Sequence, residues 1–289
     1  MEKLQNKNLY FVGGFLRDEI LGIPSFDVDY CYEGNAIEEF STLNYDVIKT
    51  NPSFGTVRIF KEGLGEIDIA STREEKYPRK GHLPEVFNIG CSLETDLKRR
   101  DFTINTLARC TTSENQIIDF YDGIGDIKKR QLKVLHDDSF IDDPSRIVRG
   151  LKFSVRFGFE FEAKTRELQE EYLKNINYDM SYHRLKKELV ETFNLNKQEA
   201  YEKFIKEGIY KLLAPNQEVP KINHSIEEIL SNYQTKHTWL IYLAQFDLSN
   251  LELTRQEKKI LEWAKRLETE EPTNNTPQES ILLRHLWQD

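Results

Sequence analysis

The hydrophobic pattern of this chain changes once, near the sequence Asp142-Asp143-Pro144. Before this point, short apolar or alternating runs that are typical of strands are interleaved with helical segments. The expected strands are residues 9–12, 27–32, 56–60, 65–70 and 116–120, and the expected helices are 14–21, 35–43 and 95–110. After it, only segments of helical periodicity follow, at 144–157, 163–175, 182–194, 197–207, 226–233, 239–246, 254–267 and 277–286. The pattern predicts an α+β fold, in which a head with a small mixed β-sheet and helices precedes an all-α part.

Composition limits the class of protein. With 289 residues the chain is long enough for two domains. No run approaches the ~20 apolar residues of a membrane span, and the polar first residues carry no targeting signal, so we expect a cytoplasmic protein without a membrane partner. Three widely spaced cysteines indicate reduced thiols and no structural metal. The net charge of −9 argues against indiscriminate binding to nucleic acid, but it permits a local basic track.

Two aspartates in the head have the spacing of metal ligands. Asp27 and Asp29 are two residues apart on an expected strand, so their carboxylates point to one face and offer hard oxygen atoms to a Mg²⁺ ion. Upstream, Gly13 and Gly14 stand between an apolar strand and a helical segment, where backbone N–H groups can bind a phosphate. Metal-binding carboxylates beside a phosphate site indicate nucleotidyl transfer. Each piece alone has an ordinary explanation, a turn or a chance Asp-x-Asp.

Three further residues of the head are candidates. Asp68, in the alternating run Glu66-Ile67-Asp68-Ile69-Ala70, could join the metal site or accept a proton from an attacking hydroxyl, and it could equally be a solvent-facing strand residue. The segment 97–108 leaves Arg100 and Asn105 on a polar face. Because the planar fork of arginine matches phosphate oxygens, Arg100 is a candidate ligand of a triphosphate.

The helical segment after Pro144 carries basic residues at three- and four-residue spacing, which predicts a basic stripe along one face. These residues are Arg146, Arg149, Lys152 and Arg156. Asp143 and Arg146 could together read a base edge, since Asp143 would accept a hydrogen bond from the exocyclic amine of C or A and Arg146 would donate to the neighbouring ring atom. The keto groups of U and G would leave an acceptor facing an acceptor. This arrangement predicts selection of C and A, whereas an N-cap aspartate before a surface helix is the simpler interpretation of the segment alone.

Taken together, these clusters resemble the class II tRNA nucleotidyltransferase and poly(A) polymerase family, over about residues 8 to 190. The family motif of paired glycines, Arg-Asp and Asp-x-Asp matches residues 13–29, and its Arg-Arg-Asp-Phe-Thr-x-Asn matches 99–105. The motif Glu-Asp-x-x-Arg matches 142–146 with Asp142 in place of Glu, and Glu-Arg-x-x-x-Glu matches 183–188 with His183 in place of the first acid. The segment 117–130 resembles the hinge between head and neck.

The resemblance implies a role for each matched residue. Asp27 and Asp29 would bind Mg²⁺, with Asp68 as a third acid. Gly13, Gly14, Arg17, Arg100 and Asn105 would form the nucleotide site, in which Gly14, Arg17 and Arg100 hold the triphosphate. Asp143 and Arg146 would act as an amino-acid template for the base, with Arg149 nearby and Lys152 where an arginine is common. Residues 1–137 would be the catalytic head, 138–200 a helical neck that reads the base, and 201–289 a helical body with a reduced tail that binds RNA.

The implied activity is template-independent addition of CMP, AMP or both from CTP and ATP to the 3′ end of tRNA, with release of pyrophosphate. The implied partners are the tRNA 3′ end and acceptor stem, and no stable protein partner is evident. Residues 72–86 look more like the branch of CC-adding, A-adding and some CCA-adding enzymes than like poly(A) polymerases. Three alternatives stay open: a partial CC-adding or A-adding enzyme, a poly(A) polymerase, and a catalytically silent relative that binds RNA.

Overall fold

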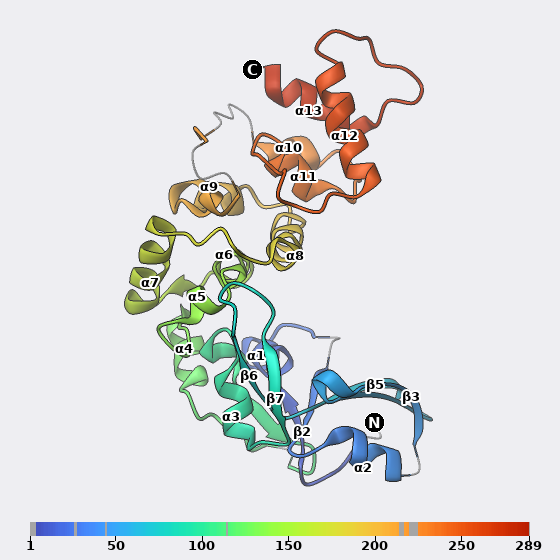
Figure 1. Cartoon of the computed structure of the whole chain (residues 1–289), viewed down its shortest axis with the longest axis vertical. Helices are drawn as coiled ribbons and strands as arrows, with labels where there is room; N and C mark the ends of the chain where they lie inside the picture. Colours follow the sequence, from blue (N-terminus) through green and yellow to red (C-terminus); the bar gives the residue numbers. More distant parts are fainter. Residues whose placement is uncertain are drawn as a thin grey trace. The chain divides into compact units, whose positions relative to one another are not determined.

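The computed structural model describes residues 4–25, 28–43, 45–113, 115–213, 217–219 and 225–288. The chain divides into two compact units, Met1–Asp142 with Glu160–Thr165, and Asp143–Phe159 with Arg166–Asp289 (Figure 1). The expected α+β class is confirmed, because the first unit holds a mixed sheet and the second consists of helices. In the described part of the chain, no helix is long and apolar enough to cross a membrane.

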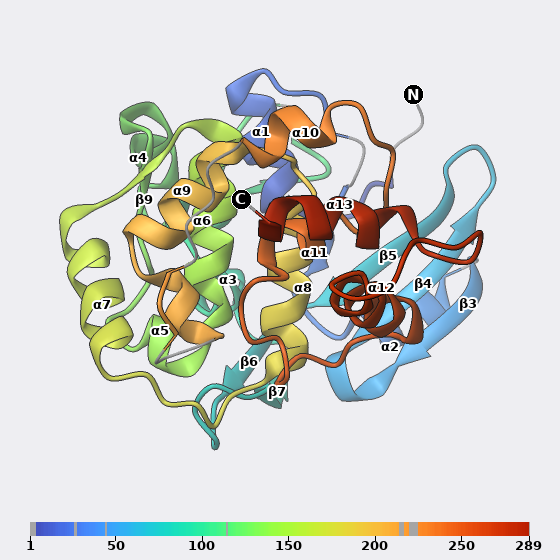
Figure 2. The ribbon, with the colours of Figure 1, turned by 90° about the horizontal axis from the view of Figure 1, so that it is seen from above.

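A six-stranded sheet organises the first unit, in the order β3-β4-β5-β2-β1-β8. Its strands are β1 (Leu9–Val12), β2 (Tyr30–Tyr32), β3 (Asp46–Asn51), β4 (Thr56–Lys61), β5 (Gly65–Ser71) and β8 (Ala108–Cys110). Strands β2 and β5 run parallel and the other neighbours run antiparallel. Strands β3, β4 and β5 lie side by side in Figure 2. In this outer half of the sheet, strands β4 and β5 alternate between buried and accessible side chains, whereas β3 is exposed along its whole length.

One face of that outer half packs against helix α2 (Ala36–Thr42). Val57 and Ile59 of β4 and Ile67 and Ile69 of β5 are buried there with Phe40 of α2. Asn35 caps the helix, since its side chain accepts hydrogen bonds from the backbone N–H groups of residues 37 and 38. The opposite face of β4 and β5 therefore presents the polar residues of the alternating pattern.

The remaining elements of the first unit connect the strands. They are α1 (Gly14–Leu21), η1 (Pro52–Phe54), the β6 (Arg73–Lys76) and β7 (Glu85–Ile89) hairpin, α3 (Leu93–Lys98), η2 (Thr103–Asn105), α4 (Gly123–Lys129), β9 (Gln131–Leu132), α5 (Ser139–Asp142) and β10 (Glu160–Phe161). Strand β10 pairs with β9 in parallel, so the expectation of no strand after residue 142 is wrong. Two residues are too few to leave a periodic signal.

Two expected elements of the head are wrong and one begins late. The segment 95–110 is not one helix: α3 ends at Lys98, Phe102 is extended with φ −131° and ψ 151°, and β8 pairs with β1. The sheet hydrogen bonds of β8 outweigh a helical pattern that its residues share with a strand. Residues 116–120 form no strand, and only Ile118 bridges Ala108. The strand expected over 27–32 begins at Tyr30, and Asp27 lies outside the described residues.

The second unit is built from helices that pack in succession. They are α6 (Ser145–Phe157), α7 (Ala163–Lys174, whose first residues belong to the first unit), α8 (Tyr182–Phe193), α9 (Gln198–Lys206), η3 (Ile209–Leu212), α10 (Ile226–Leu230), α11 (Thr238–Leu243), α12 (Arg255–Arg266) and α13 (Gln278–Gln288). Helix α6 packs against α8 and α9, α8 against α11, and α12 against α13. Pro144 is the residue before α6 and not its first residue. The packed face of α6 holds Ile147, Val148 and Leu151, as the sequence pattern predicts.

Candidate functional site

The turn from β1 into α1 depends on Gly13. This residue has φ 71°, a conformation that side chains disfavour, and its N–H donates to the carbonyl of Leu107 at 2.9 Å. A Cβ atom at Gly13 would lie 2.7 Å from Nη1 of Arg100. The turn is thus closed around the arginine, and the sequence-predicted Gly13 and Arg100 are neighbours in the structure.

Arg100 is held loosely by its present partners. Its Nη1 donates to the carbonyl of Asn105 and its Nη2 to Oδ2 of Asp96, both at 3.4 Å. Its Nε is buried and has no hydrogen-bond partner among the described residues. A buried N–H without a partner is costly, and an anion between Arg100 and the glycine turn would supply the acceptor that it lacks.

Asp96 is a site residue that the sequence interpretation missed. Its side chain is fully buried, and Oδ1 accepts from Nε and Nη2 of Arg99 at 3.0 and 2.9 Å and from the backbone N–H of Arg73 at 3.1 Å. Burial alone would raise the pKa of Asp96, but the charges of Arg99 and Arg100 outweigh it and hold this pKa below its usual range. Asp96 therefore stays ionised and attracts Arg100 toward Gly13.

Arg17 and Asn105 form a second buried group. Arg17 donates through Nε and Nη2 to Oδ1 of Asp18 at 2.8 and 2.7 Å, and through Nη1 to Oδ1 of Asn105 at 2.6 Å. Asn105 donates in turn to Asp101 at 2.9 Å. The guanidinium of Arg17, whose side chain is 6% exposed, ties α1 to η2. Arg17 and Asn105 both flank the glycine turn. Of the two arginines, Arg100 has the longer hydrogen bonds and is therefore more available to a ligand.

The structure brings two predicted acids to adjacent positions. Tyr30 pairs with Ile69 across the parallel β2 and β5, so the preceding residues Asp29 and Asp68 occupy neighbouring register positions. Tyr30 and Ile69 belong to the core side, and Asp29 and Asp68 are exposed. The carbonyl of Asp29 accepts from the N–H of Val12 at 3.1 Å, which fixes its backbone beside β1. The acids thus lie on the face of the sheet opposite α2, part of which α3 covers at Cys31.

Asp68 is already engaged. Its two oxygens accept from Nε and Nη2 of Arg58 at 2.8 and 2.6 Å. This hydrogen bonding holds the pKa of Asp68 below its usual range. Among the described residues, which exclude Asp27, no three His, Cys, Asp or Glu side chains converge as a metal site. Asp29 has the donor chemistry for a divalent ion, whereas Asp68 must leave Arg58 to become a ligand.

The second unit holds the predicted base-reading pair. Oδ1 of Asp143 accepts from the hydroxyl of Ser145 at 2.6 Å and from its N–H at 3.2 Å. Oδ2 accepts from Arg184 of α8 and lies 3.8 Å from Nε of Arg146. Asp143 and Arg146 are both buried. The structure therefore brings the pair together and adds Arg184, which the sequence interpretation had placed in a motif but not in the site.

Acidic residues of α8 neutralise much of the charge of the basic stripe that was expected on α6. Arg149 donates to Glu188 at 3.0 Å, and Lys152 donates to Glu188 and Glu191 at 2.7 and 2.5 Å. Lys152 and Glu188 are buried. Glu188 was missed as a site residue, although its four-residue spacing from Arg184 puts both on one face of α8. Arg149 and Lys152 thus join α6 to α8.

Comparisons with known proteins converge on one family. Residues 9–133 match the family model described as the poly A polymerase head domain. An A-adding tRNA nucleotidyltransferase of Aquifex aeolicus is 42% identical over 164 residues, which cover 55% of this chain and 20% of that protein. A CCA-adding enzyme of Lactobacillus delbrueckii subsp. bulgaricus is 33% identical over 217 residues, which cover 72% of this chain and 53% of that protein.

The fold of the whole chain is also similar to solved structures. An apo form of a CCA-adding enzyme aligns with a TM-score of 0.77 and 26% identity, over 96% of this chain and 75% of that chain. The present chain spans about a fifth of the length of the A-adding enzyme of Aquifex aeolicus and about half of the length of the CCA-adding enzyme of Lactobacillus delbrueckii subsp. bulgaricus.

Proposed function

We propose that this chain, which belongs to the class II tRNA nucleotidyltransferase and poly(A) polymerase family through its head, adds CMP, AMP or both to the 3′ end of tRNA. CTP and ATP would be the donors and pyrophosphate the leaving group. The observation that carries the proposal is the closed turn at Gly13 with Arg100 against it, one strand away from the exposed carboxylate of Asp29. This is a triphosphate site beside a metal ligand.

The residues around the turn would bind the triphosphate. Arg100 would donate to phosphate oxygens through its free Nε, and the backbone N–H groups at the start of α1, beginning with Gly14, would add to it. Arg17 and Asn105 would stabilise the glycine turn through the hydrogen bond between their side chains. Asp96 would keep Arg100 in place.

Nucleotidyltransferases generally depend on a divalent cation, and for this chain we propose Mg²⁺. Asp27 and Asp29 would hold it, since carboxylate oxygens are the ligands that Mg²⁺ prefers. When bound, it would neutralise charge on the phosphates and favour attack by an oxygen. Asp68 would act as the third acid after its oxygens leave Arg58.

Base selection would belong to Asp143 and Arg146. The two carboxylate oxygens of Asp143 are fixed by hydrogen bonds from Ser145 and Arg184. A fixed acceptor favours the amines of C and A and disfavours the carbonyls of U and G. Arg149 and Lys152, tied to Glu188, would support this pair by fixing α6 against α8.

Each part of the chain would have its own role. We assign residues 1–137 to catalysis, 138–200 to base reading and 201–289 to binding of the tRNA acceptor stem. With this tRNA-processing activity, we propose a cytoplasmic location. The second candidate function is a partial activity, because the relatives include A-adding as well as CCA-adding enzymes.

Product length tests the proposal. The protein is incubated with Mg²⁺, labelled CTP or ATP, and tRNA that lacks one, two or three terminal nucleotides. A CCA-adding enzyme restores all three tRNAs, and a partial enzyme extends only the tRNA that matches its step. Long adenylate tails on unrelated RNA indicate a poly(A) polymerase. No incorporation on any RNA contradicts the proposal and leaves the silent relative.

A further inference from the structure

A row of exposed charged side chains crosses the face of the sheet opposite α2. Asp29 neighbours Asp68 across β2 and β5, Asp68 pairs with Arg58 across β5 and β4, and Arg58 pairs with Lys49 across β4 and β3. The row therefore runs from two acids at the centre of the sheet to two bases at its outer edge. Neighbouring strands are ~4.8 Å apart, so Lys49 lies on the order of 10 Å from Asp68.

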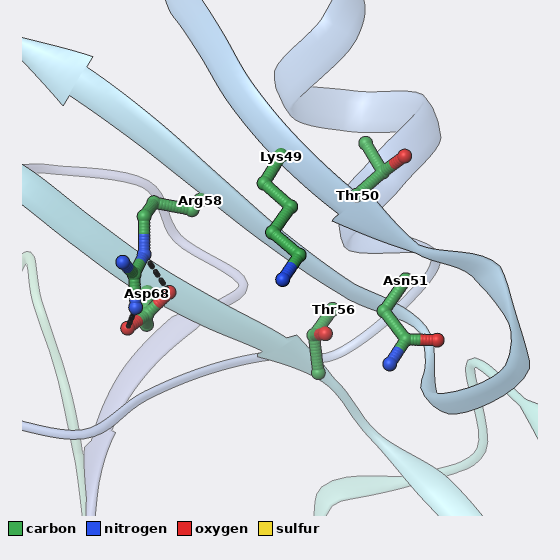
Figure 3. A pocket seen from close by; sticks show the side chains of 6 residues that line it. All are labelled: Lys49, Thr50, Asn51, Thr56, Arg58 and Asp68. Atoms are coloured by element: carbon green, nitrogen blue, oxygen red, sulfur yellow. Dashed lines mark hydrogen bonds and ion pairs between the residues drawn. The ribbon is translucent and has the colours of Figure 1, made fainter.

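A pocket of about 220 Å³ opens at the basic end of this row (Figure 3). It is lined entirely by polar side chains: Lys49, Thr50, Asn51, Thr56, Arg58 and Asp68. In Figure 3 the ammonium group of Lys49 lies between the Arg58–Asp68 pair and the side chains of Thr56 and Asn51. Asn51 pairs with Thr56 in the register, so both stand one step further along the same face.

The charge of Lys49 is available in this pocket. The side chain of Lys49 is exposed and forms no hydrogen bond or ion pair within the part of the chain that the structure describes, although its charge attracts Asp68. Arg58, by contrast, is neutralised by the bidentate contact with Asp68. One unpaired ammonium beside hydroxyl and amide groups suits a ligand with an anionic group next to polar hydroxyls, such as a phosphodiester and its ribose.

We propose that this pocket binds the RNA strand that is extended, at the nucleotide next to its 3′ end. Lys49 binds the phosphodiester, and Thr56 and Asn51 form hydrogen bonds with the ribose or base. The inference rests on the proposed function, in which the attacking 3′ hydroxyl of the RNA lies beside Asp29 and Asp68 at the other end of the row. An RNA strand that ends at Asp29 and Asp68 and continues along the row reaches Lys49. The incoming nucleotide, at Arg100 and the glycine turn, lies on the other side of the acids.

Three variants test the pocket. Lys49→Gln removes the charge, Thr56→Val removes a hydroxyl at constant shape, and Lys61→Gln is the matched control. Lys61 ends β4 and alternates with Phe60 onto the face of Val57 and Ile59, away from the pocket. Circular dichroism and melting temperature confirm that each variant is folded.

Steady-state kinetics on trimmed tRNA separate the two substrates. We expect Lys49→Gln to raise the KM for tRNA at least fivefold with an unchanged KM for CTP, Thr56→Val to raise the KM for tRNA two- to threefold, and Lys61→Gln to change neither. A rise in the KM for CTP alone assigns the pocket to the nucleotide and overturns the proposal. Unchanged values for both substrates also overturn it.

If the wild-type protein extends no RNA, the proposed function fails. Direct binding of RNA then still tests the pocket. Fluorescence anisotropy with a labelled single-stranded oligoribonucleotide that ends in CC measures affinity against salt concentration. Each phosphate contact contributes about 0.7 to the slope of log K against log salt for single strands. Lys49→Gln should lower this slope by about 0.7 and Lys61→Gln should leave it unchanged. Equal slopes for wild type and Lys49→Gln refute the pocket independently of catalysis.

Discussion

Asp96 shows how a buried charge can prepare a binding site without touching the ligand. Its carboxylate is surrounded by Arg99, Arg100 and the N–H of Arg73, and its Oδ2 also accepts from Sγ of Cys31 in β2. In the sequence it stands in a run of charged residues that is typical of an exposed helix. Local sequence predicted Arg100 through its chemistry, but only the fold reveals which acid orients it.

Asp96→Asn should destabilise the protein in a pH-dependent way. Removing the charge of this buried acid, which pairs with two partly exposed arginines, costs about 3 kcal/mol at pH 7. Because the folded-state pKa of Asp96 is lowered, its contribution is complete above the unfolded value near 3.8 and is lost as pH falls through the folded value. Urea unfolding should therefore show a stability difference from wild type that shrinks below about pH 4. A difference that is constant with pH contradicts the ionised pair.

Gly13→Ala should impair the triphosphate site beyond its backbone strain. The new Cβ would stand 2.7 Å from Arg100 and displace it, so the KM for CTP should rise about tenfold. Gly22→Ala is the matched control, since Gly22 has φ 69° and a Cβ there meets no atom within 4 Å. Gly22→Ala should lose about 1 kcal/mol of stability from its left-handed conformation, and Gly13→Ala should lose more, because its ψ of −127° lies in a region that side chains strongly disfavour. Equal KM values for the two variants would show that Arg100 does not depend on the turn.

Arg146→Ala should reduce discrimination among nucleotides. Removal of one base-reading donor costs about 1–3 kcal/mol, or roughly tenfold in the preference for CTP and ATP over UTP and GTP. Competition between labelled nucleotides measures this ratio directly. An unchanged ratio in a folded variant excludes Arg146 from base reading.

At the scale of elements, prediction succeeded where the signal is local. Residues 9–12 and 14–21 form β1 and α1 with the expected bounds, because an apolar run, a glycine turn and a helical pattern follow one another there. Strands β3, β6 and β7 were not predicted, since their residues are mostly exposed and depend on pairing with distant segments. The same dependence on pairing made residues 108–110 a strand.

The β6–β7 hairpin illustrates what such pairing adds. Its loop is bound to the end of α5, because Lys80 donates to Oδ1 of Asp142 at 2.5 Å and the N–H of Gly81 donates to the Asp142 carbonyl at 3.1 Å. The hydrogen bond with Asp142 raises the pKa of Lys80. The loop is thus fixed at the residue that precedes the predicted base-reading pair.

Lys80→Met should loosen this loop. We expect the Gly81 amide to exchange its hydrogen several times faster, because a bond that holds the loop is lost. Lys76→Met, in the same hairpin, removes only an exposed 3.6 Å ion pair with Glu85 and should leave Gly81 unchanged. Equal exchange in both variants would mean that the bond from Lys80 does not hold the loop.

At the scale of the whole molecule, sequence motifs predicted the fold class and the resemblance that the head-domain match supports, but not how the site is assembled. The neighbouring positions of Asp29 and Asp68 arise from the parallel pairing of β2 with β5, whose residues lie about 40 positions apart in the chain. No periodicity predicts that pairing. The two sets of site residues also belong to separate units, with the acids and Arg100 in the first and Asp143 with Arg146 in the second.

The central claim is that exposed acids beside a triphosphate site transfer a nucleotide to RNA. The most direct measurement is the rate of labelled CMP and AMP incorporation into trimmed tRNA by wild type, Asp29→Asn and Asp27→Asn, with binding of CTP measured in parallel. We predict incorporation by wild type, a loss of at least a thousandfold in both variants, and melting temperatures close to wild type. Near-normal incorporation by either folded variant would contradict the claim.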